Sequence, residues 1–137
     1  MPGITYAQNS HMKISNPVTC EHYIRSKISF LKEELWCIAL SDDCELLSHQ
    51  LISEGDFSSV PIKQRTILEF ALKSKANQII LVHSHTNQNS HPSSNDLFWT
   101  ERIHRFLKII DLKLCDHIIL SRKSSTSLLQ LEPHLFE

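Results

Sequence analysis

Several features that mark other protein classes are scarce or missing in this chain of 137 residues. Fourteen basic residues nearly cancel fifteen acidic ones, so no excess charge attracts nucleic-acid phosphate or an anionic membrane. The longest purely apolar stretch has six residues, Leu35 to Leu40, far too short to span a bilayer. The N-terminus has no apolar segment of the signal-peptide kind. We therefore expect a cytoplasmic protein with no membrane attachment, and charge gives nucleic-acid binding no support.

Cysteine and glycine are also sparse. The four cysteines form no C-x-x-C pair, and Cys37 and Cys115 sit in apolar runs where buried thiols are common. We expect no disulfide framework and a reducing compartment. One of only two glycines, Gly55, lies in a polar stretch and marks a turn there.

Length and composition predict a single domain. With 41% hydrophobic residues, the chain can bury one core. The first residues are polar and aperiodic, and the run Asn9 to Met12 resembles a remnant of cloning. We expect residues 1–14 to be a disordered leader or such a remnant, and residues 15–137 to form the domain.

Hydrophobic periodicity predicts alternating helices and strands. Helices are expected at about 17–32, 63–77 and 94–109. Strands are expected at about 35–40, 46–52, 78–82, 112–120 and 126–131, the fourth of them interrupted by Asp116-His117. The order α-β-β-α-β-α-β-β predicts an α/β fold with a mixed sheet sandwiched by helices.

The segment HSHTNQNSHPSSND, residues 83–96, follows a buried-looking strand directly. Alternate residues of an extended chain face the same way, so His83 and His85 can hold one metal ion together. Asp96, in the first turn of the next helix, can supply a third ligand and leave a fourth position for water, as in catalytic zinc sites. The alternative is a polar loop in which Ser93 and Asp96 form only a helix capping box.

The spacing His-x-His, seven residues, Ser, two residues, Asp resembles the signature of the JAMM (MPN-plus, JAB) metalloproteases. The likeness is greatest to the RadC-like JAB domains and extends from about Pro17 to Ser121. It includes further positions on both sides of the signature: Glu34 eight residues before Asp42, Gly55, Arg65, Thr100 four residues after Asp96, and Asp116-His117.

The chain departs from the RadC-like pattern at some positions. Ser84 stands between the histidines where Asn is usual, and Thr86-Asn87-Gln88 replaces a Pro-Ser-Gly turn. Gln64-Arg65-Thr66 replaces Pro-Arg-Glu at the start of a helix. The departures leave the three ligand positions intact.

The resemblance implies a JAB/MPN, cytidine-deaminase-like fold and one zinc ion per chain, bound by His83, His85 and Asp96. It further implies that Glu34 is the general base that takes a proton from the attacking water. Glu33 is the neighbouring alternative, although alternation along the strand turns its side chain to the opposite face.

Three further roles follow from the same resemblance. Ser93 would donate a hydrogen bond to the oxyanion, which is easiest if Ser94 and not Ser93 caps the helix. Asp116 and His117 are either partners that orient a ligand imidazole or a buried structural pair. His91 is expected at the rim of the site without a ligand role.

The resulting hypothesis is a zinc-dependent metallopeptidase or isopeptidase of the JAMM type, a hydrolase that cleaves an amide bond. The substrate would be a peptide or an isopeptide-linked protein, with a ubiquitin-like protein as one candidate. The alternative is a non-catalytic RadC-type scaffold or a DNA-repair-associated interaction module. A phosphoesterase would need further His and Asp ligands downstream, and a zinc deaminase would need His-x-Glu and Pro-Cys-x-x-Cys, which the chain lacks.

Overall fold

The computed structural model describes residues 3–8, 11–55 and 60–137, and the side chains of 60–62 are not described. Its six-stranded sheet has the order β1-β3-β2-β4-β5-β6. The strands are β1 (Thr5–Tyr6), β2 (Glu34–Leu40), β3 (Leu46–Glu54), β4 (Gln78–Ser84), β5 (Lys113–Leu120) and β6 (Ser125–Ser127). The helices are α1 (Pro17–Ile24), α2 (Val60–Lys73), α3 (Ser94–Ile109) and α4 (Leu128–Leu131), with short 3-10 helices at Arg25–Lys27 and Pro133–Phe136.

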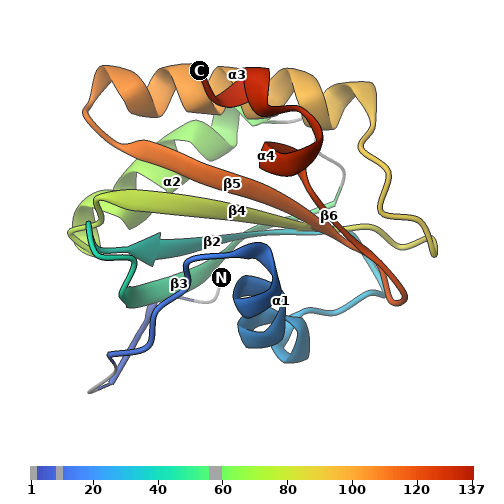
Figure 1. Cartoon of the computed structure of the whole chain (residues 1–137), viewed down its shortest axis with the longest axis horizontal. Helices are drawn as coiled ribbons and strands as arrows, with labels where there is room; N and C mark the ends of the chain where they lie inside the picture. The colour runs from blue at the N-terminus through green and yellow to red at the C-terminus, as the bar shows by residue number, and fades with distance from the viewer. Residues whose placement is uncertain (1–2, 9–10, 56–59) are drawn as a thin grey trace.

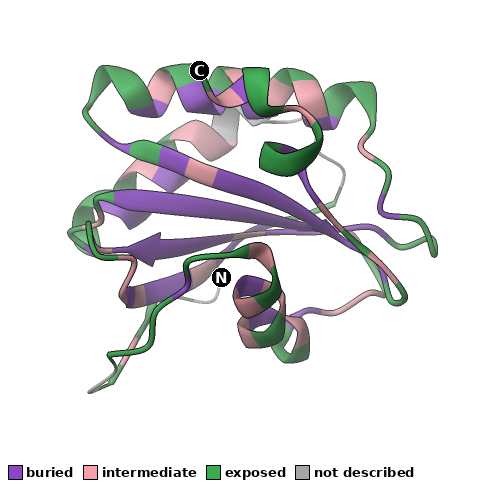
Figure 2. Cartoon of the chain, in the orientation of Figure 1, coloured by how far each residue is buried: buried purple, intermediate pink, exposed green. Residues whose placement is uncertain are grey.

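The sheet is mixed and covered on both faces, as the sequence predicts. β4 pairs with β5 in parallel, whereas the other neighbouring pairs are antiparallel. Figure 1 shows α1 below the sheet and α2 and α3 above it. The central strands β2 and β4 are buried along nearly their whole length, as Figure 2 shows. This two-sided burial is the reason why their sequences are continuous apolar runs without a polar face.

Alternation along the central strands divides the core into two clusters. Leu35, Cys37 and Ala39 of β2 face α2 and α3. Ile38 and Leu40 face α1. On β4, Ile79 and Leu81 belong to the first cluster, while Ile80 and Val82 belong to the second. The same alternation decides on which face each polar residue at the strand ends stands.

Three expected elements differ from the structure. The helix from Pro17 ends at Ile24 and continues only as a 3-10 turn, because the chain is already extended at Ile28. β5 runs through Asp116-His117 without interruption. The expected final strand at 126–131 was wrong beyond Ser127, where helix α4 begins.

The cause of the C-terminal difference is a buried carboxylate. Asp116 accepts hydrogen bonds from the Ser127 hydroxyl (2.6 Å) and from the backbone N–H of Leu129 (3.0 Å). Ser127 also caps α4 by accepting from Gln130 N. Leu128 and Leu129 therefore begin helix α4, although the apolar pattern of the sequence predicted a strand there.

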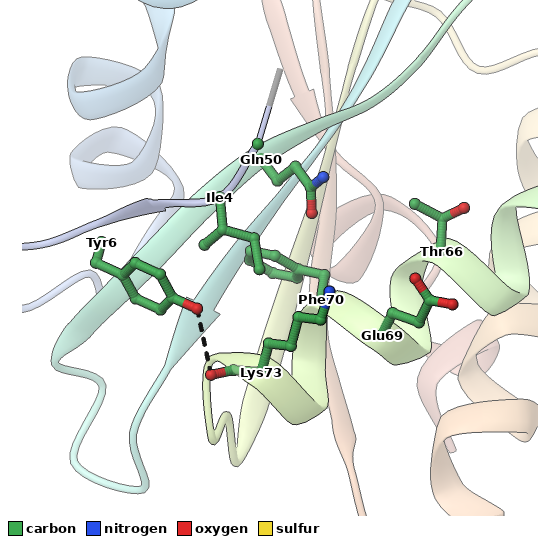
Figure 3. A pocket seen from close by; sticks show the side chains of 8 residues that line it. Ile4, Tyr6, Gln50, Thr66, Glu69, Phe70 and Lys73 are labelled. Atoms are coloured by element: carbon green, nitrogen blue, oxygen red, sulfur yellow. Dashed lines mark hydrogen bonds between the residues drawn. The ribbon is translucent and has the colours of Figure 1, made fainter. Parts of the chain in front are cut away.

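Part of the expected leader belongs to the fold. β1 pairs with β3, a bridge joins Lys13 to Glu45, and the Ile14 side chain is fully buried against the α1 face of the sheet. β1 also forms one wall of a cavity of about 310 Å³ against α2 (Figure 3). There the Tyr6 hydroxyl reaches the backbone carbonyl of Lys73.

None of the helices in the described ranges is long and apolar enough to cross a bilayer.

Burial of Ile14 generates a stability prediction. Ile14→Ala is expected to lower the free energy of unfolding by about 2–5 kcal/mol, because it removes a buried side chain and leaves a cavity. Val18→Ala, at a position that is 75% exposed, is the control and should change it by less than about 0.5 kcal/mol. Urea unfolding followed by fluorescence measures both values. Equal stabilities of the Ile14→Ala protein and the parent would show that the segment before α1 does not pack on the sheet.

Candidate metal centre

The end of β4 brings two buried histidines together. His83 and His85 are 2% and 8% exposed, and their ring centroids lie 5.1 Å apart with nearly perpendicular planes. His83 continues the side of β4 that carries Leu81, so both rings lie on the α2 and α3 face of the sheet. Ser84, between them, points to the other face. The structure thus places the two imidazoles on one side of the chain.

Asp96 joins the two histidines. Its carboxylate lies 3.0 Å from His83 Nδ1 through Oδ1 and 3.2 Å from His85 Nε2 through Oδ2, and the residue is only 1% exposed. Burial alone would raise the pKa of Asp96, but the hydrogen bonds from His83 and His85 outweigh it and hold that pKa well below the usual range of a carboxyl group. Asp96 is therefore an ionised carboxylate between two imidazoles.

The ring of His85 shows why a cation fits here. A carbonyl oxygen can only accept, so the 3.1 Å contact with the backbone oxygen of Asn89 puts a proton on His85 Nδ1. His85 Nε2 faces the Asp96 carboxylate and must then carry either a second proton or a metal ion. The hydrogen bond to Asp96 raises the pKa of His85, which favours the doubly protonated ring in the absence of metal. A metal ion would replace that proton.

A second carboxylate lies on the other side of His83. Glu33 Oε1 is 3.9 Å from His83 Nε2. Glu33, His83 and His85 each offer a ligand atom within 4.8 Å of the other two. The residues thus supply two imidazoles and two carboxylates, a donor set suited to zinc. Either carboxylate can complete a three-ligand site, Asp96 from α3 or Glu33 from the chain before β2.

The structure places Glu34, predicted as the general base, away from the histidines. Its Oε1 accepts hydrogen bonds from the backbone N–H of Ser29 (2.9 Å) and from the indole N–H of Trp36 (3.0 Å). Trp36 packs with the cluster on the α1 face. Glu33, the alternative to Glu34 in the sequence analysis, is the glutamate that lies beside His83.

The register of the β2–β4 pairing explains why Glu33, and not Glu34, lies beside His83. In the β2–β4 ladder Leu35 lies opposite His83, so residues of β2 that share the parity of Leu35 share the face of His83. Glu33 has that parity and Glu34 has the other. The sequence alone showed the alternation between the two glutamates but not which of them faces the histidines, because that depends on the pairing partner.

Backbone contacts hold Glu33 in place. The Ser84 hydroxyl accepts from the backbone N–H of Glu34 (2.9 Å) and donates to the carbonyl of Lys32 (3.5 Å), so it binds the chain on both sides of Glu33. The Glu33 carbonyl accepts from the backbone N–H of Gly55 (2.8 Å). Gly55 has a φ of 101°, a conformation that favours glycine. The residue between the two histidines thus positions the glutamate beside them.

Ser93, and not Ser94, caps α3. Ser93 Oγ accepts from the backbone N–H of Asp96 (3.0 Å), and the Asp96 carboxylate accepts from the backbone N–H of Ser93 (2.8 Å), which makes a complete capping box. The expectation that Ser94 caps the helix and leaves Ser93 unengaged was wrong. Accepting at Oγ still leaves the hydroxyl proton of Ser93 able to donate, and its side chain is exposed.

Thr100 binds the backbone of Asp96, and His117 binds Thr100. The Thr100 hydroxyl donates to the backbone carbonyl of Asp96, one helical turn earlier, and lies 2.6 Å from His117 Nδ1. The one hydroxyl proton of Thr100 goes to the Asp96 carbonyl. In the contact between Thr100 and His117, the proton is therefore on His117 Nδ1, which donates to the Thr100 oxygen. Burial lowers the pKa of His117 to about 3, so the ring is neutral near pH 7.

The two residues of the Asp116-His117 pair thus have separate contacts. His117 lies on the face of the candidate metal centre, with its ring centroid 6.2 Å from that of His83. Asp116 binds Ser127 and Leu129.

The low pKa of His117 predicts acid sensitivity in protein treated with a chelator. The unfolded chain protonates His117 near pH 6.5 but the folded chain only near 3, so stability contributed by the neutral ring is lost as pH falls between these values. The loss is about 1.4 kcal/mol per pH unit. Comparing urea unfolding of the parent and of His117→Gln from pH 4 to 6 should show a shallower slope in the variant. Identical slopes would mean that His117 titrates normally.

Comparisons with known proteins identify the family of the chain. A family model described as the RadC-like JAB domain matches residues 14–133. The chain is 32% identical over 124 residues to a UPF0758 protein of Psychrobacter sp. (strain PRwf-1), covering 87% of this chain and 55% of that protein. It is 32% identical over 112 residues to a UPF0758 protein of Aquifex aeolicus (strain VF5), covering 82% and 48%.

The chain spans about half the length of the curated relatives it matches, and their names state no activity. The family match includes all the strands from β2 to β6 and every residue of the candidate metal centre. The chain belongs to the RadC-like JAB domain family.

Proposed function

We propose that this protein is a zinc-dependent peptidase or isopeptidase that hydrolyses an amide bond in a peptide or in an isopeptide-linked protein. The observation that carries the proposal is the convergence of His83, His85, Asp96 and Glu33 at the end of β4. Membership of a JAB superfamily that includes metalloproteases supports it. The names of the UPF0758 relatives neither support nor oppose it.

Zinc would be held by His83, His85 and Asp96. Asp96 is the better third ligand because it is buried, ionised and already in contact with both imidazoles. Its capping box and the bond from Thr100 hold its backbone in position. When bound, zinc polarises a carbonyl group and lowers the pKa of a coordinated water.

Glu33 would act as the general base. Its side chain is 30% exposed, so it can meet both a water molecule and an arriving substrate. The 3.9 Å separation from His83 Nε2 is longer than a hydrogen bond. The carboxylate would take the proton of the attacking water and deliver it to the departing amine. The Ser93 hydroxyl, at the exposed start of α3, would donate to the carbonyl oxygen as negative charge develops there.

The two adjacent glutamates provide a matched test of this assignment. Glu33→Gln is expected to lower the rate of hydrolysis by about 10²–10⁴-fold while the protein keeps its zinc, because the amide cannot accept the proton. Glu34→Gln should retain most of the activity, because an amide oxygen can still accept from Ser29 and Trp36. A panel of linear and isopeptide-linked peptides, together with zinc analysis of each purified protein, measures both properties.

The outcomes of this test are separable. Loss of zinc in Glu33→Gln would make Glu33 a ligand and contradict its role as base. Loss of zinc in Asp96→Asn is expected. Parent protein that binds no zinc would contradict the proposed function as a whole.

The contact of His85 with Asp96 predicts how zinc affinity depends on pH. A proton competes with the metal for His85 Nε2, and the raised pKa of His85 means that this competition continues above pH 6.5. Zinc affinity should therefore increase by up to about tenfold per pH unit as pH rises through that pKa, and level off above it. Asp96 does not add to the pH dependence of zinc affinity, because its carboxylate stays ionised over this pH range. Competition with a chromophoric chelator from pH 6 to 8 measures this, and a flat profile would contradict the protonated state of His85.

A further inference from the structure

The loop between His85 and Asp96 forms one wall of an open cavity of about 430 Å³. The other wall is the β5–β6 hairpin. The lining residues are all polar and none is acidic or aliphatic: Gln88, Asn89, Ser90, His91, Ser124 and Thr126. The cavity adjoins the candidate metal centre, because the carbonyl of Asn89 is the group that binds His85 Nδ1.

A row of hydroxyl groups connects the two walls. Ser121 Oγ lies 2.7 Å from Ser124 Oγ, Ser124 donates to Ser90 Oγ (2.9 Å), and Ser90 lies 2.9 Å from Thr126 Oγ1. Ser121 also accepts from the backbone N–H groups of Lys123 and Ser124, so its own proton goes to Ser124 Oγ. The direction of donation along the row is thereby determined as far as Ser90.

One hydroxyl proton of this row is not used in a hydrogen bond between its members. Four hydroxyl groups carry four protons, and the row contains three hydrogen bonds between them. Whichever way the Ser90–Thr126 bond is oriented, the remaining proton belongs to one of these two residues, at the cavity. Within the part of the chain that the structure describes, no protein acceptor takes it. The wall therefore presents a hydroxyl donor to whatever enters.

The amide groups add further donors. Asn89 Oδ1 accepts from the backbone N–H of His91 (2.6 Å), and the NH₂ group of Asn89 remains as a donor. Gln88 is exposed and contributes a second NH₂ group. Arg122 and Lys123 lie in the β5–β6 turn beside the cavity and are exposed as well. The lining residues thus offer several hydrogen-bond donors and no carboxylate, and two cationic residues precede Ser124 in the chain.

From this arrangement we propose that the cavity is a substrate subsite for a carboxylate group carried close to the amide bond that is cut. The inference rests on the proposed hydrolytic function and adds a substrate preference to it. A carboxylate accepts several hydrogen bonds at once, and bonds to a charged acceptor are stronger than those to a neutral one. Two sources share this chemistry, an acidic side chain and the carboxyl terminus of a peptide.

The test measures binding in the presence of a chelator, so that neither zinc nor catalysis is needed. The probes are an alanine tripeptide with an acetylated N-terminus and a free carboxyl terminus, its amide-capped form, and the amide-capped form with glutamate or with glutamine in the middle. NMR titration of the full chain gives each dissociation constant. A carboxylate probe should bind about tenfold more tightly than its neutral counterpart. Whether the glutamate or the free carboxyl terminus gives this difference identifies the source.

Variants of the cavity wall test whether the preference for carboxylate probes arises in this cavity. Gln88→Glu places a negative charge at an exposed position in the wall and should abolish the preference. Asn87→Asp, a matched charge on a neighbouring exposed residue that does not line the cavity, should largely keep it, since Asp can still accept from Asn89 N. Thr126→Val alone should keep it, because Ser90 then holds the surplus proton. The triple variant Ser90→Ala/Ser124→Ala/Thr126→Val should weaken it, because the one hydroxyl proton left over then belongs to Ser121, which does not line the cavity.

Two outcomes would overturn the subsite. One is equal binding of the carboxylate and neutral probes by the parent protein. The other is a preference that persists unchanged in both Gln88→Glu and the triple variant, because the carboxylate would then bind elsewhere. A failure of hydrolysis with the preference intact would count against the proposed function and not against the subsite.

Discussion

The antiparallel pairing of β2 with β4 is the constraint on which the candidate metal centre depends. Its register sets Leu35 opposite His83, and the two-residue period of a strand then assigns every neighbouring polar residue to a face. Glu33, His83 and His85 fall on the face covered by α2 and α3, while Glu34 and Ser84 fall on the α1 face. A shift of one residue in this pairing would place Glu34 and not Glu33 beside the histidines.

Electrostatics accounts for the rest of the arrangement. A buried carboxylate is stable only when it is well paired, and Asp96 is paired with two imidazoles and with the backbone of its own helix start. His85 in turn is oriented by the Asn89 carbonyl, so its Nε2 can meet Asp96 only through a proton or a metal ion. The protein thus assembles a negatively charged, largely dehydrated site in which a divalent cation would replace the protons on the rings. Thr100 and His117 hold Asp96 from the rear without adding charge.

Much of this could be predicted from the sequence, for identifiable reasons. The order of the elements from α1 to β5 follows from periodicity, because the central strands are covered on both faces and the helices have one apolar side. The helix at 94–109 was predicted with its observed bounds, since a capping residue and a regular apolar pattern coincide there. The proximity of His83, His85 and Asp96 follows from local geometry at the junction of one strand and one helix.

The remaining features depend on contacts that local pattern does not encode. Glu33 and Glu34 are adjacent and chemically identical, and only the pairing of β2 with β4 distinguishes them. Helix α4 forms where a strand was expected because Asp116, distant in sequence, binds Ser127 and Leu129. The segment before α1 looked like a leader because, of its side chains in residues 3–8 and 11–16, only that of Ile14 is deeply buried.

The most direct test of the central claim is a zinc-edge anomalous diffraction map from crystals of the zinc-loaded protein. We expect a single peak at the end of β4, coordinated by one nitrogen from each of His83 and His85 and by Asp96, with Glu33 beside it but not bound to it. No peak at this position, or a peak in which Glu33 replaces Asp96 as the third ligand, would contradict it.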